Sequence, residues 1–436
     1  LYTSINYEEF KMSKSINVPK LRFKEFSGEW EEKKFADIYD FFQTNSFSRA
    51  LLNYESGDVK NIHYGDIHTK FKSNFFINKE EVPFINTEID ISKIKDENYC
   101  QIKDLIIADA SEDYNDIGKA IEIIELNGEK LVAGLHTYIA RDIKNKMALG
   151  FGGYFMQTHN IRLQMMKLAT GISVLGISKS NLSNISLVIP SKKEQEKIAS
   201  FLISIDTKIE QLIKKEQLLQ QYKKSVMQKI FNQEIRFKDD DGSEFCEWEE
   251  KKLGNICKLQ GGFAFKSEQF RKSGIPIIRI SNISNINNYI DRENIVYYDA
   301  IPNDRNFSIT NGDLIVAMSG ATTGKASIYN LNEKAYLNQR VGLFRANKDK
   351  LYYGYLVQFV FSKLFYRQLD TVLVAGAQPN ISSKDIEDFK FNLPCLKEQI
   401  KIANFLSSID SKIEQVQQHL NSTKEFKKAL LQQMFV

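Results

Sequence analysis

Several features that point to common protein classes are scarce or missing in this sequence. Only four of its 436 residues are cysteines, and no two form a C-x-x-C pair, so their spacing predicts neither a zinc site nor a small disulfide framework. No stretch approaches about 18 consecutive apolar residues, and the N-terminus lacks the basic-then-apolar pattern of a secretion signal. We therefore expect a cytoplasmic protein with reduced cysteines and no contact with a membrane. The cysteines are Cys100, Cys246, Cys257 and Cys395.

The motifs of familiar enzymes are also missing. The five histidines form no H-E-x-x-H or other metal-binding spacing, and there is neither a G-x-S-x-G elbow nor the N-P-P-[FY] or D-P-P-[FY] tetrapeptide of amino-methyltransferases. SGATTGKAS at 319–327 resembles a phosphate-binding loop, but only three residues separate Gly320 from Gly324, and Ala326 stands where Ser or Thr should hold magnesium. We predict a turn between strands there, and we expect no active site, metal or cofactor in this chain.

What the sequence does contain is an internal repeat. KEQEKIASFLISIDTKIEQ at 193–211 returns as KEQIKIANFLSSIDSKIEQ at 397–415, an offset of 204 residues, and 16 of 24 aligned positions around these stretches are identical. Shorter matches precede them, such as GEWEEKKF at 28–35 with CEWEEKKL at 246–253. Two copies of one unit explain this pattern, each a mixed domain of about 160 residues followed by a long helix.

Both repeated helices carry the pattern of a coiled coil. Alternating steps of four and three residues from Ile198 and from Ile402 each reach eight apolar residues in ten positions, a period of 3.5 residues over more than four heptads. Because two such seams most simply bury each other, we predict an antiparallel coiled coil that relates the two halves by a pseudo-twofold axis. The alternative is that each helix packs on its own domain as an ordinary core helix. The predicted seam residues are Ile198, Leu202, Ile205, Ile209, Leu212, Leu219, Val226, Ile230, Ile402, Leu406, Ile409, Ile413, Val416, Leu420, Leu430 and Met434.

These patterns predict an α+β protein in which two mixed α/β domains are joined by two long helices. VKNIHYGDI at 59–67 and IPIIRISNI at 275–283 predict strands that end in a turn. Ser191 with Glu194 predicts a capping box at the start of the first long helix. The sequence does not begin with methionine, which leaves two alternatives, non-standard initiation or a start elsewhere, for which Met12 is a candidate. The expected segments are an N-terminal extension without stable order at 1–17, a first domain at 18–190, a central helix at 191–236, a second domain with its linker at 237–394, and a C-terminal helix at 395–436.

Charge is distributed unevenly between the two domains. Residues 33–189 contain 18 Lys and Arg against 20 Asp and Glu, whereas residues 251–393 contain 19 against 12, and the linker at 237–250 has a net charge of −6. The resulting net charge of +7 favours DNA binding by the second domain through its field alone, whereas the first domain, at −2, has no such field. Local patches are still sufficient for a reader of DNA sequence, because phosphate contacts position a protein while base contacts specify.

Two mixed domains that each begin near LRF or IRF and WEEKK, and that each end in a helix with the motif E-Q-x-x-I-A-x-F-L-x-x-I-D-x-K-I-E, resemble the specificity subunit of a Type I restriction-modification system. The resemblance covers about residues 19–436. It implies a non-catalytic subunit made of two target-recognition domains. The implied partners are double-stranded DNA, two methyltransferase subunits with S-adenosylmethionine, and translocating nuclease subunits with ATP and magnesium. The alternative is a coiled-coil scaffold that recruits partners without reading DNA.

The resemblance also suggests a physical reason for the repeat. Two readers held apart by stiff helices suit a DNA target with two half-sites, which lie about 34 Å apart when they are one turn of B-DNA apart. Each methyltransferase subunit would find an equivalent surface on one of the two copies.

The same resemblance places several loops of each domain on the DNA side. Arg279 is a candidate for a bidentate contact with guanine or for a contact with phosphate alone. In the first domain, ADASEDYNDIGK stands in the place of the glycine turn SGATTGK. The alternative for the Ser, Thr and Asn residues is that they only close turns, where such residues are favoured. The candidate DNA-binding residues are Arg279, Ser281, Asn282, Ser319, Thr322, Thr323, Lys325, Gln378 and Asn380 in the second domain, and His63, Tyr64, Ser111, Tyr114, Asn115 and Lys119 in the first.

Overall fold

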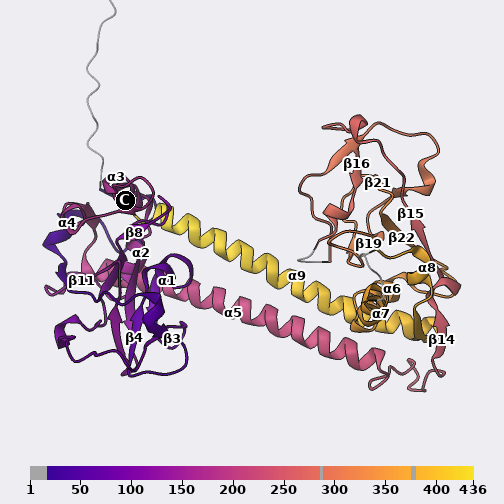
Figure 1. The fold of residues 1–436 in the computed structure, drawn as a ribbon, viewed down its shortest axis with the longest axis horizontal. Helices are drawn as coiled ribbons and strands as arrows, with labels where there is room; N and C mark the ends of the chain where they lie inside the picture. The colour runs from indigo at the N-terminus through magenta and orange to yellow at the C-terminus, as the bar shows by residue number, and fades with distance from the viewer. Residues whose placement is uncertain (1–16, 285–287, 375–379) are drawn as a thin grey trace, which may run out of the picture. The chain divides into compact units, whose positions relative to one another are not determined.

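The structure is a computed structural model that describes residues 17–284, 288–374 and 380–436. The chain forms two compact units, both of mixed α/β structure (Figure 1). Unit 1 contains the chain up to Leu212 together with His419–Val436, and unit 2 contains Ile213–Gln418. Within the described ranges, no helix has the length and apolar character needed to cross a membrane. Of the predicted N-terminal extension, residues 1–16 lie outside the described part of the chain.

In the part of unit 1 that the structure describes, the strands form two sheets and two short ribbons. At the centre of the first sheet is a completely buried strand that pairs antiparallel with a neighbour on each side; the strands in spatial order are β2 (Asp40–Phe42), β11 (Thr137–Arg141), β7 (Leu105–Ala108), β9 (Ala120–Glu125) and β5 (Asn74–Phe76). The second sheet has the order β10 (Lys130–Ala133), β4 (Val59–Ile62), β6 (Phe84–Ile85) and β3 (Leu52–Asn53), with β10 parallel to β4. The ribbons are β1 (Glu31–Lys34) with β13 (Ser186–Ile189), and β8 (Ala110–Ser111) with β12 (Leu175–Gly176). The helices that begin in this unit are α1 (Tyr64–Thr69), α2 (Phe151–Phe155), α3 (His159–Leu168), α4 (Lys179–Ser183) and α5 (Lys192–Phe231).

Unit 2 repeats this organisation. Its first sheet has the order β15 (Cys257–Gly261), β22 (Val341–Ala346), β19 (Leu314–Ala317) and β20 (Ala326–Ile328), with the completely buried β19 antiparallel to both neighbours. Its second sheet has the order β17 (Val296–Tyr298), β16 (Ile275–Ile278), β21 (Ala335–Leu337) and β18 (Ser308–Ile309), with β16 parallel to β21. The ribbon is β14 (Glu249–Lys252) with β23 (Lys390–Leu393). The helices that begin in this unit are α6 (Tyr353–Val360), α7 (Lys363–Val374), α8 (Ser383–Glu387) and α9 (Leu396–Gln433).

The two strands predicted from the runs at 59–67 and 275–283 are shorter than expected. β4 ends at Ile62, because His63 caps the following helix: its Nδ1 accepts a hydrogen bond of 3.1 Å from the backbone N–H of Gly65. β16 likewise ends at Ile278, and a single turn of 3-10 helix follows over Ile280–Asn282. The turn predicted within 319–327 is confirmed, since the segment between β19 and β20 joins two antiparallel strands.

A glutamine near the start of each long helix ties that helix to its domain in the same way. Gln195 accepts a hydrogen bond of 2.8 Å from Ala148 N and donates one of 3.0 Å to Pro190 O. Gln399 accepts one of 2.8 Å from Tyr352 N and donates one of 2.8 Å to Pro394 O. All three positions are offset by 204 residues, so the repeat seen in the sequence extends to individual hydrogen bonds.

A buried glutamate next to each glutamine forms an ion pair with the arginine that precedes the domain. Glu194 accepts two hydrogen bonds of 2.7 Å from Arg22, and Glu398 accepts bonds of 3.0 and 3.4 Å from Arg236. The predicted capping box is only half correct. Ser191 Oγ does accept from Glu194 N at 3.4 Å, but the Glu194 carboxylate, which the box requires to reach back, is occupied by Arg22.

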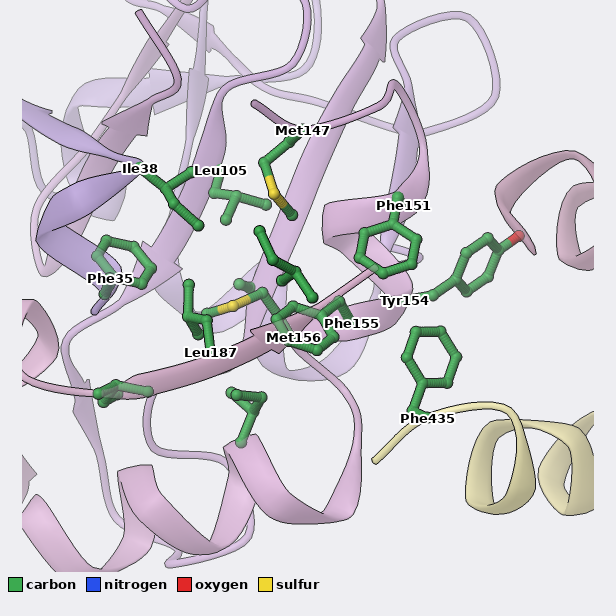
Figure 2. Close-up of a cluster of buried hydrophobic side chains, with 14 of the residues drawn as sticks. Phe35, Ile38, Leu105, Met147, Phe151, Tyr154, Phe155, Met156, Leu187 and Phe435 are labelled. Carbon is green, nitrogen blue, oxygen red and sulfur yellow. The ribbon is translucent and has the colours of Figure 1, made fainter. Parts of the chain in front are cut away.

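In unit 1, segments of both long helices share one core with the sheet domain. Ile198 and Leu202 of α5 and Leu430 of α9 are buried in the same hydrophobic cluster as the strands. Figure 2 shows Phe435, just beyond the end of α9, facing the rings of α2; its centroid lies 5.6 Å from that of Phe151. Each fully buried Leu, Ile or Phe side chain contributes about 1.5–3 kcal/mol to stability, so these contacts hold both helices firmly against the domain.

Unit 2 contains the corresponding helix packing. Val226 and Ile230 of α5 lie in one cluster with Ile402 and Leu406 of α9 and with the aromatic side chains of α6. Across the two units, thirteen of the sixteen predicted seam residues are buried; Ile209, Leu219 and Ile413 are half-buried. Within each unit, the seam residues in these clusters therefore face both the other helix and the sheet domain, which combines the two packing modes considered from the sequence.

A polar contact between the helices is also repeated. In unit 1, Asp206 accepts hydrogen bonds of 2.6 Å from both Lys427 and the Tyr154 hydroxyl. In unit 2, Asp410 accepts bonds of 2.6 Å from Lys223 and 3.0 Å from Gln358, which stands at the position equivalent to Tyr154. These lysines occupy polar positions within the apolar seam, and a partly buried ion pair at such a position fixes the register of two helices.

Candidate nucleic-acid interface

In unit 2, the ends of several strands bring the sequence-predicted DNA-binding segments together. Arg279 directly follows β16, and the segment 318–325 directly follows β19. Because β22 runs antiparallel to β19, its first residues lie beside the end of β19, and Arg340 directly precedes β22. β21 runs parallel to β16, so the residues after it emerge at the same edge as Arg279. This edge of the two sheets is the candidate interface of unit 2.

Hydrogen bonds between these segments fix their positions. The Thr322 hydroxyl donates to Ile280 O at 3.0 Å, which joins the glycine turn to the segment after β16. Met318 N donates to Arg340 O at 2.9 Å, and Ile381 N donates to Met318 O at 2.9 Å. Ser319 and Asn380 form a backbone bridge. The predicted residues therefore gather in one place, except Gln378, which lies outside the described residues.

The side chains in this group differ in their exposure and in the hydrogen bonds that they already make within the protein. Ser281 and Asn380 are exposed. Asn282 is completely buried, and its side chain accepts from Arg279 N and donates to Asp291 O and Glu293 O. The Thr323 hydroxyl donates to Gly320 O within the glycine turn. Asn282, Thr322 and Thr323 thus make the bonds of turn-closing residues, the alternative that the sequence left open.

Two polar groups at this edge are buried without a hydrogen-bond partner among the described residues: Arg279 Nε and Ser319 Oγ. One end of the Arg279 guanidinium is already held, since its NH2 donates to Asn294 O at 2.8 Å and the group lies 5.9 Å from the centroid of the Phe270 ring. An unpaired buried donor costs about 1–3 kcal/mol. A ligand that accepts from Arg279 and Ser319 would remove that cost. Lys325 is half-buried in the same turn.

Unit 1 forms the same edge from different residues. His63 follows β4 as Arg279 follows β16, and Asp109 follows β7 as Met318 follows β19. The bond from Met318 N to Arg340 O has its counterpart in a 3.1 Å bond from Asp109 N to His136 O. Gly118 and Gly324 close the two turns at equivalent positions, with φ of +68° and +78°, and a Cβ at either would lie within 3 Å of a buried side chain. Only glycine meets both demands.

A cluster of aromatic and histidine rings lies at this edge of unit 1. The Tyr64 ring centroid is 4.6 Å from that of His63, 5.7 Å from that of His68 and 5.4 Å from that of His136. Burial lowers the pKa of His63, with Arg49 acting in the same direction, and burial also lowers the pKa of His68. Both imidazoles are therefore neutral at pH 7, and they present hydrogen-bonding edges rather than positive charge.

The remaining candidates of unit 1 belong to the loop 109–119. The Ser111 hydroxyl accepts from Asp113 N, and the Asn115 amide donates to the Asp113 carboxylate, so both side chains stabilise the loop. Lys119 donates to His68 O at 3.1 Å and pairs with Asp116 at 2.6 Å. Tyr114 is 55% exposed, and its ring is accessible to a ligand.

Two exposed residues at these edges, His136 and Arg340, were not predicted from the sequence. They stand 204 residues apart, each directly before the strand that pairs with the buried central strand. His136 has a positive φ of 57°, which is uncommon for a residue other than glycine, and its Nδ1 lies 3.3 Å from Asp109 Oδ1. The 204-residue offset was the signal that could have revealed this pair. The described residues contain no group of three His, Cys, Asp or Glu side chains that could hold a metal.

The comparisons with known proteins agree with this arrangement. The family model of the Type I restriction modification DNA specificity domain matches residues 27–221 and 246–424, one match in each repeat, and the chain belongs to this family. It is 27% identical to the MjaVIII specificity subunit of a Type I restriction enzyme from Methanocaldococcus jannaschii, over 68% of this chain and 71% of that protein. It is 25% identical to the putative MjaX specificity subunit of the same organism, over 96% and 95%. The crystal structure of the S subunit of a Type I restriction-modification system from M. genitalium has the same fold, with a TM-score of 0.58, 15% identity, and coverage of 96% of this chain and 99% of that one.

Proposed function

We propose that this chain is the non-catalytic subunit that gives a Type I restriction-modification complex its DNA sequence specificity. Each unit reads one half of a bipartite double-stranded DNA target with the loops at the edge described above. The main support for this proposal is that the two units share the same arrangement of strands and helices but have different loops at this edge. Arg279, the glycine turn and Arg340 in unit 2 stand where unit 1 has His63, the acidic loop 109–119 and His136. Unlike loops on a common frame are what two different half-sites require.

The long helices act as the spacer between the two readers. We propose that they form one antiparallel coiled coil with pseudo-twofold symmetry. The seam of apolar residues and the paired lysine–aspartate contacts of each unit support this arrangement. A helix of 40 residues, such as α5, is about 60 Å long at 1.5 Å per residue, which is sufficient to hold two readers on half-sites about 34 Å apart.

The repeat also accounts for the proposed partners. A surface that occurs twice can bind the same subunit twice, so two methyltransferase subunits dock on this chain and supply S-adenosylmethionine and the transfer of the methyl group. Translocating nuclease subunits supply ATP hydrolysis, magnesium and cleavage in the complete cytoplasmic complex. This chain itself contributes recognition and spacing, not a reacting group.

A gel-shift experiment tests this function. The full chain, together with its methyltransferase subunit, is mixed with a library of duplexes, and the bound fraction is sequenced; the methylated sites of the host DNA are mapped with and without this gene. We expect enrichment of one bipartite motif with a fixed unread gap, and loss of methylation at that motif when the gene is removed. A complex that binds all duplexes equally would instead support the scaffold that recruits partners without reading DNA.

A further inference from the structure

Two of the cysteines, Cys246 and Cys395, lie together in unit 2. β14 and β23 pair with Glu249 opposite Leu393, and continuing this register by two residues places position 247 opposite position 395. Both cysteines line one cleft of about 460 Å³. Cys246 is exposed and Cys395 is half-buried, so a small molecule can reach at least the first thiol.

The surrounding contacts hold the two backbones in place. On one side of Cys246, Arg236 donates a 2.7 Å bond to its carbonyl oxygen, and Trp248 Nε1 donates a 2.8 Å bond to Glu398 in the first turn of α9. Cys395 is fixed by the helix itself, because its carbonyl oxygen accepts the first helical hydrogen bond of α9, from Gln399 N at 3.0 Å. The segment before β14 is therefore fixed on the start of α9, and the two thiols remain neighbours.

The equivalent place in unit 1 contains neither cysteine. Gly28 stands at the position of Cys246, and Ser191 stands at the position of Cys395. The repeats are otherwise closely matched here, with E-W-E-E-K-K after the first position and K-E-Q shortly after the second. Both members of the pair thus occur in the second repeat and both are absent from the first, which gives the molecule its own internal control.

We propose that Cys246 and Cys395 are a dithiol site that is oxidised by a low-molecular-weight disulfide such as oxidised glutathione. The product is an intramolecular disulfide between the two cysteines. The Cys246 thiolate attacks one sulfur of oxidised glutathione, which forms a mixed disulfide and releases one glutathione thiolate. The Cys395 thiolate then attacks the Cys246 sulfur, which forms the Cys246–Cys395 bond and releases the second glutathione. The two cysteines are oxidised, two glutathione sulfurs are reduced, and the two protons lost by the cysteines pass to the released thiolates.

The new bond would join the segment leading into the second domain to the start of the helix that leaves it. It would close a loop that contains the whole sheet domain of unit 2, whereas unit 1 would stay unchanged. Partial removal of its thiol from water and the neighbouring Cys395 thiol raise the pKa of Cys246. Because the thiolate is the nucleophile, the reaction is expected to become faster as the pH rises above neutral.

Peptide mapping of the full chain tests the proposal. The protein is equilibrated in buffers of increasing oxidised-to-reduced glutathione ratio, alkylated and digested with trypsin. We expect a linked pair of peptides, 239–251 with 391–397, and a fall from four to two alkylatable thiols per chain, with buried Cys100 and Cys257 still free. Cys246→Ser and Cys395→Ser should each abolish the linked pair; the second variant restores the residue type found at position 191.

Three outcomes would overturn the proposal. The first is a stable mixed disulfide of glutathione on Cys246 with no linked pair. The second is no loss of thiols at any ratio. The third is a bond between two chains, seen as a dimer on a non-reducing gel. As a second measurement, made in a Trp30→Phe background so that Trp248 alone reports, oxidation should raise the thermal unfolding temperature when both cysteines are present and in neither serine variant.

Discussion

The two units of this molecule have the same frame and different edges. In both, an arginine pairs with a buried glutamate, a glutamine ties the long helix to the domain, and a lysine–aspartate pair joins the two helices. At the edge where the strands end, unit 1 has a cluster of aromatic and histidine rings beside an acidic loop, whereas unit 2 has arginines and a glycine turn. The regions 33–189 and 251–393 carry net charges of −2 and +7.

This difference separates what the two units share from what each does alone. A contact that occurs in both copies stabilises the shared fold, because the same contact is made whichever DNA sequence each unit reads. A residue that differs between equivalent positions, such as His136 and Arg340, is a candidate for the difference in recognition between the two edges. The basic edge of unit 2 suits a reader with many phosphate contacts, and the edge of unit 1, which lacks a positive field, suits one that depends more on base contacts.

The largest effect is expected from the buried glutamates of the frame. Glu398→Gln removes the buried charge partner of Arg236, leaving only the exposed Glu247 at 3.6 Å, and should destabilise unit 2 by about 3 kcal/mol. Glu194→Gln should destabilise unit 1 by about 1 kcal/mol less, because Glu398 also accepts from Trp248, whereas Trp30 Nε1 has no hydrogen-bond partner within the described ranges.

The chain offers a direct measurement, because it has two tryptophans, one in each unit. Trp30→Phe leaves Trp248 to report the unfolding of unit 2 by fluorescence, and Trp248→Phe leaves Trp30 to report unit 1. Glu31→Gln, a change at an exposed carboxylate, is the control and should change neither transition by more than about 0.5 kcal/mol. Equal losses in both units would show that the tryptophan bond adds nothing.

The next effect is a pH dependence that only unit 1 should show. Burial raises the pKa of Glu122 to about 7, although Gly150 N and Gly153 N donate to its carboxylate; Ile328 stands at the equivalent position of unit 2. The folded state thus holds a proton more tightly than the unfolded state. The stability from this group is complete below the ordinary glutamate pKa and is lost as the pH rises through about 7, a change of about 3 kcal/mol.

Unfolding of unit 1 followed by Trp30 fluorescence at pH 5 to 8, in the Trp248→Phe background, tests this dependence. Relative to the same protein with Glu122→Gln, which cannot ionise, the protein with Glu122 should lose stability across this range. In the Trp30→Phe background, unit 2 should behave alike with and without Glu122→Gln. A difference between the two proteins that stays constant with pH would contradict the assignment to Glu122.

A smaller effect is expected from Arg279. If it reads a base, Arg279→Ala should cost about 1–3 kcal/mol of binding and relax one position of the half-site read by unit 2. If it contacts only phosphate, all sequences should weaken evenly and the salt slope should fall by about one. The measurement is the affinity of the variant complex for the target and its single-base variants at several salt concentrations. Arg271→Ala, at an exposed arginine that pairs with Asp299, is the control, and an unchanged profile for Arg279→Ala would remove this residue from the interface.

The smallest change in affinity is expected when both helices are lengthened together. Four residues inserted after Leu212 and four after Gln418, where the chain passes between the units, add about 6 Å and about 40° of rotation. One added base pair of B-DNA gives about 3.4 Å and 36°, so the preferred unread gap should grow by one or two base pairs, with both half-sites and the affinity for the re-spaced target unchanged. Duplexes of graded spacing measure the gap. As a control, four residues inserted between Asp241 and Gly242, in the exposed linker, should leave the preferred gap unchanged. An unchanged gap in the helix variant would contradict the role of the helices as a spacer.

The sequence was sufficient to predict the repeated organisation, because that depends on patterns along the chain. The offset of 204 residues revealed the two copies, the 3.5-residue period revealed both long helices, and the spacing of Gly320 and Gly324 indicated a turn rather than a phosphate-binding loop. The segments of the candidate interface could also be named, because the resemblance to the specificity subunits indicated which loops to consider.

The contacts that determine what each segment does could not be predicted, because they join residues far apart in the chain. Nothing in the local pattern shows that Arg22 would take the carboxylate of Glu194 from its capping box. The same holds for Asn282, which looks like an accessible reader in the sequence but is buried against the backbone of Asp291 and Glu293. His63 was expected within a strand, yet it is the N-cap of α1, where its side chain accepts a hydrogen bond from the backbone.

The most direct test of the central claim, that each unit reads one half of the DNA target independently, is an exchange of one edge. Residues 25–189 are replaced with the corresponding domain of a relative that methylates a different motif, and the methylated sites of the host DNA are sequenced. We expect a hybrid motif in which one half changes, while the other half and the length of the gap stay as they were. A motif in which both halves change, or in which the untouched half is no longer specified, would contradict it.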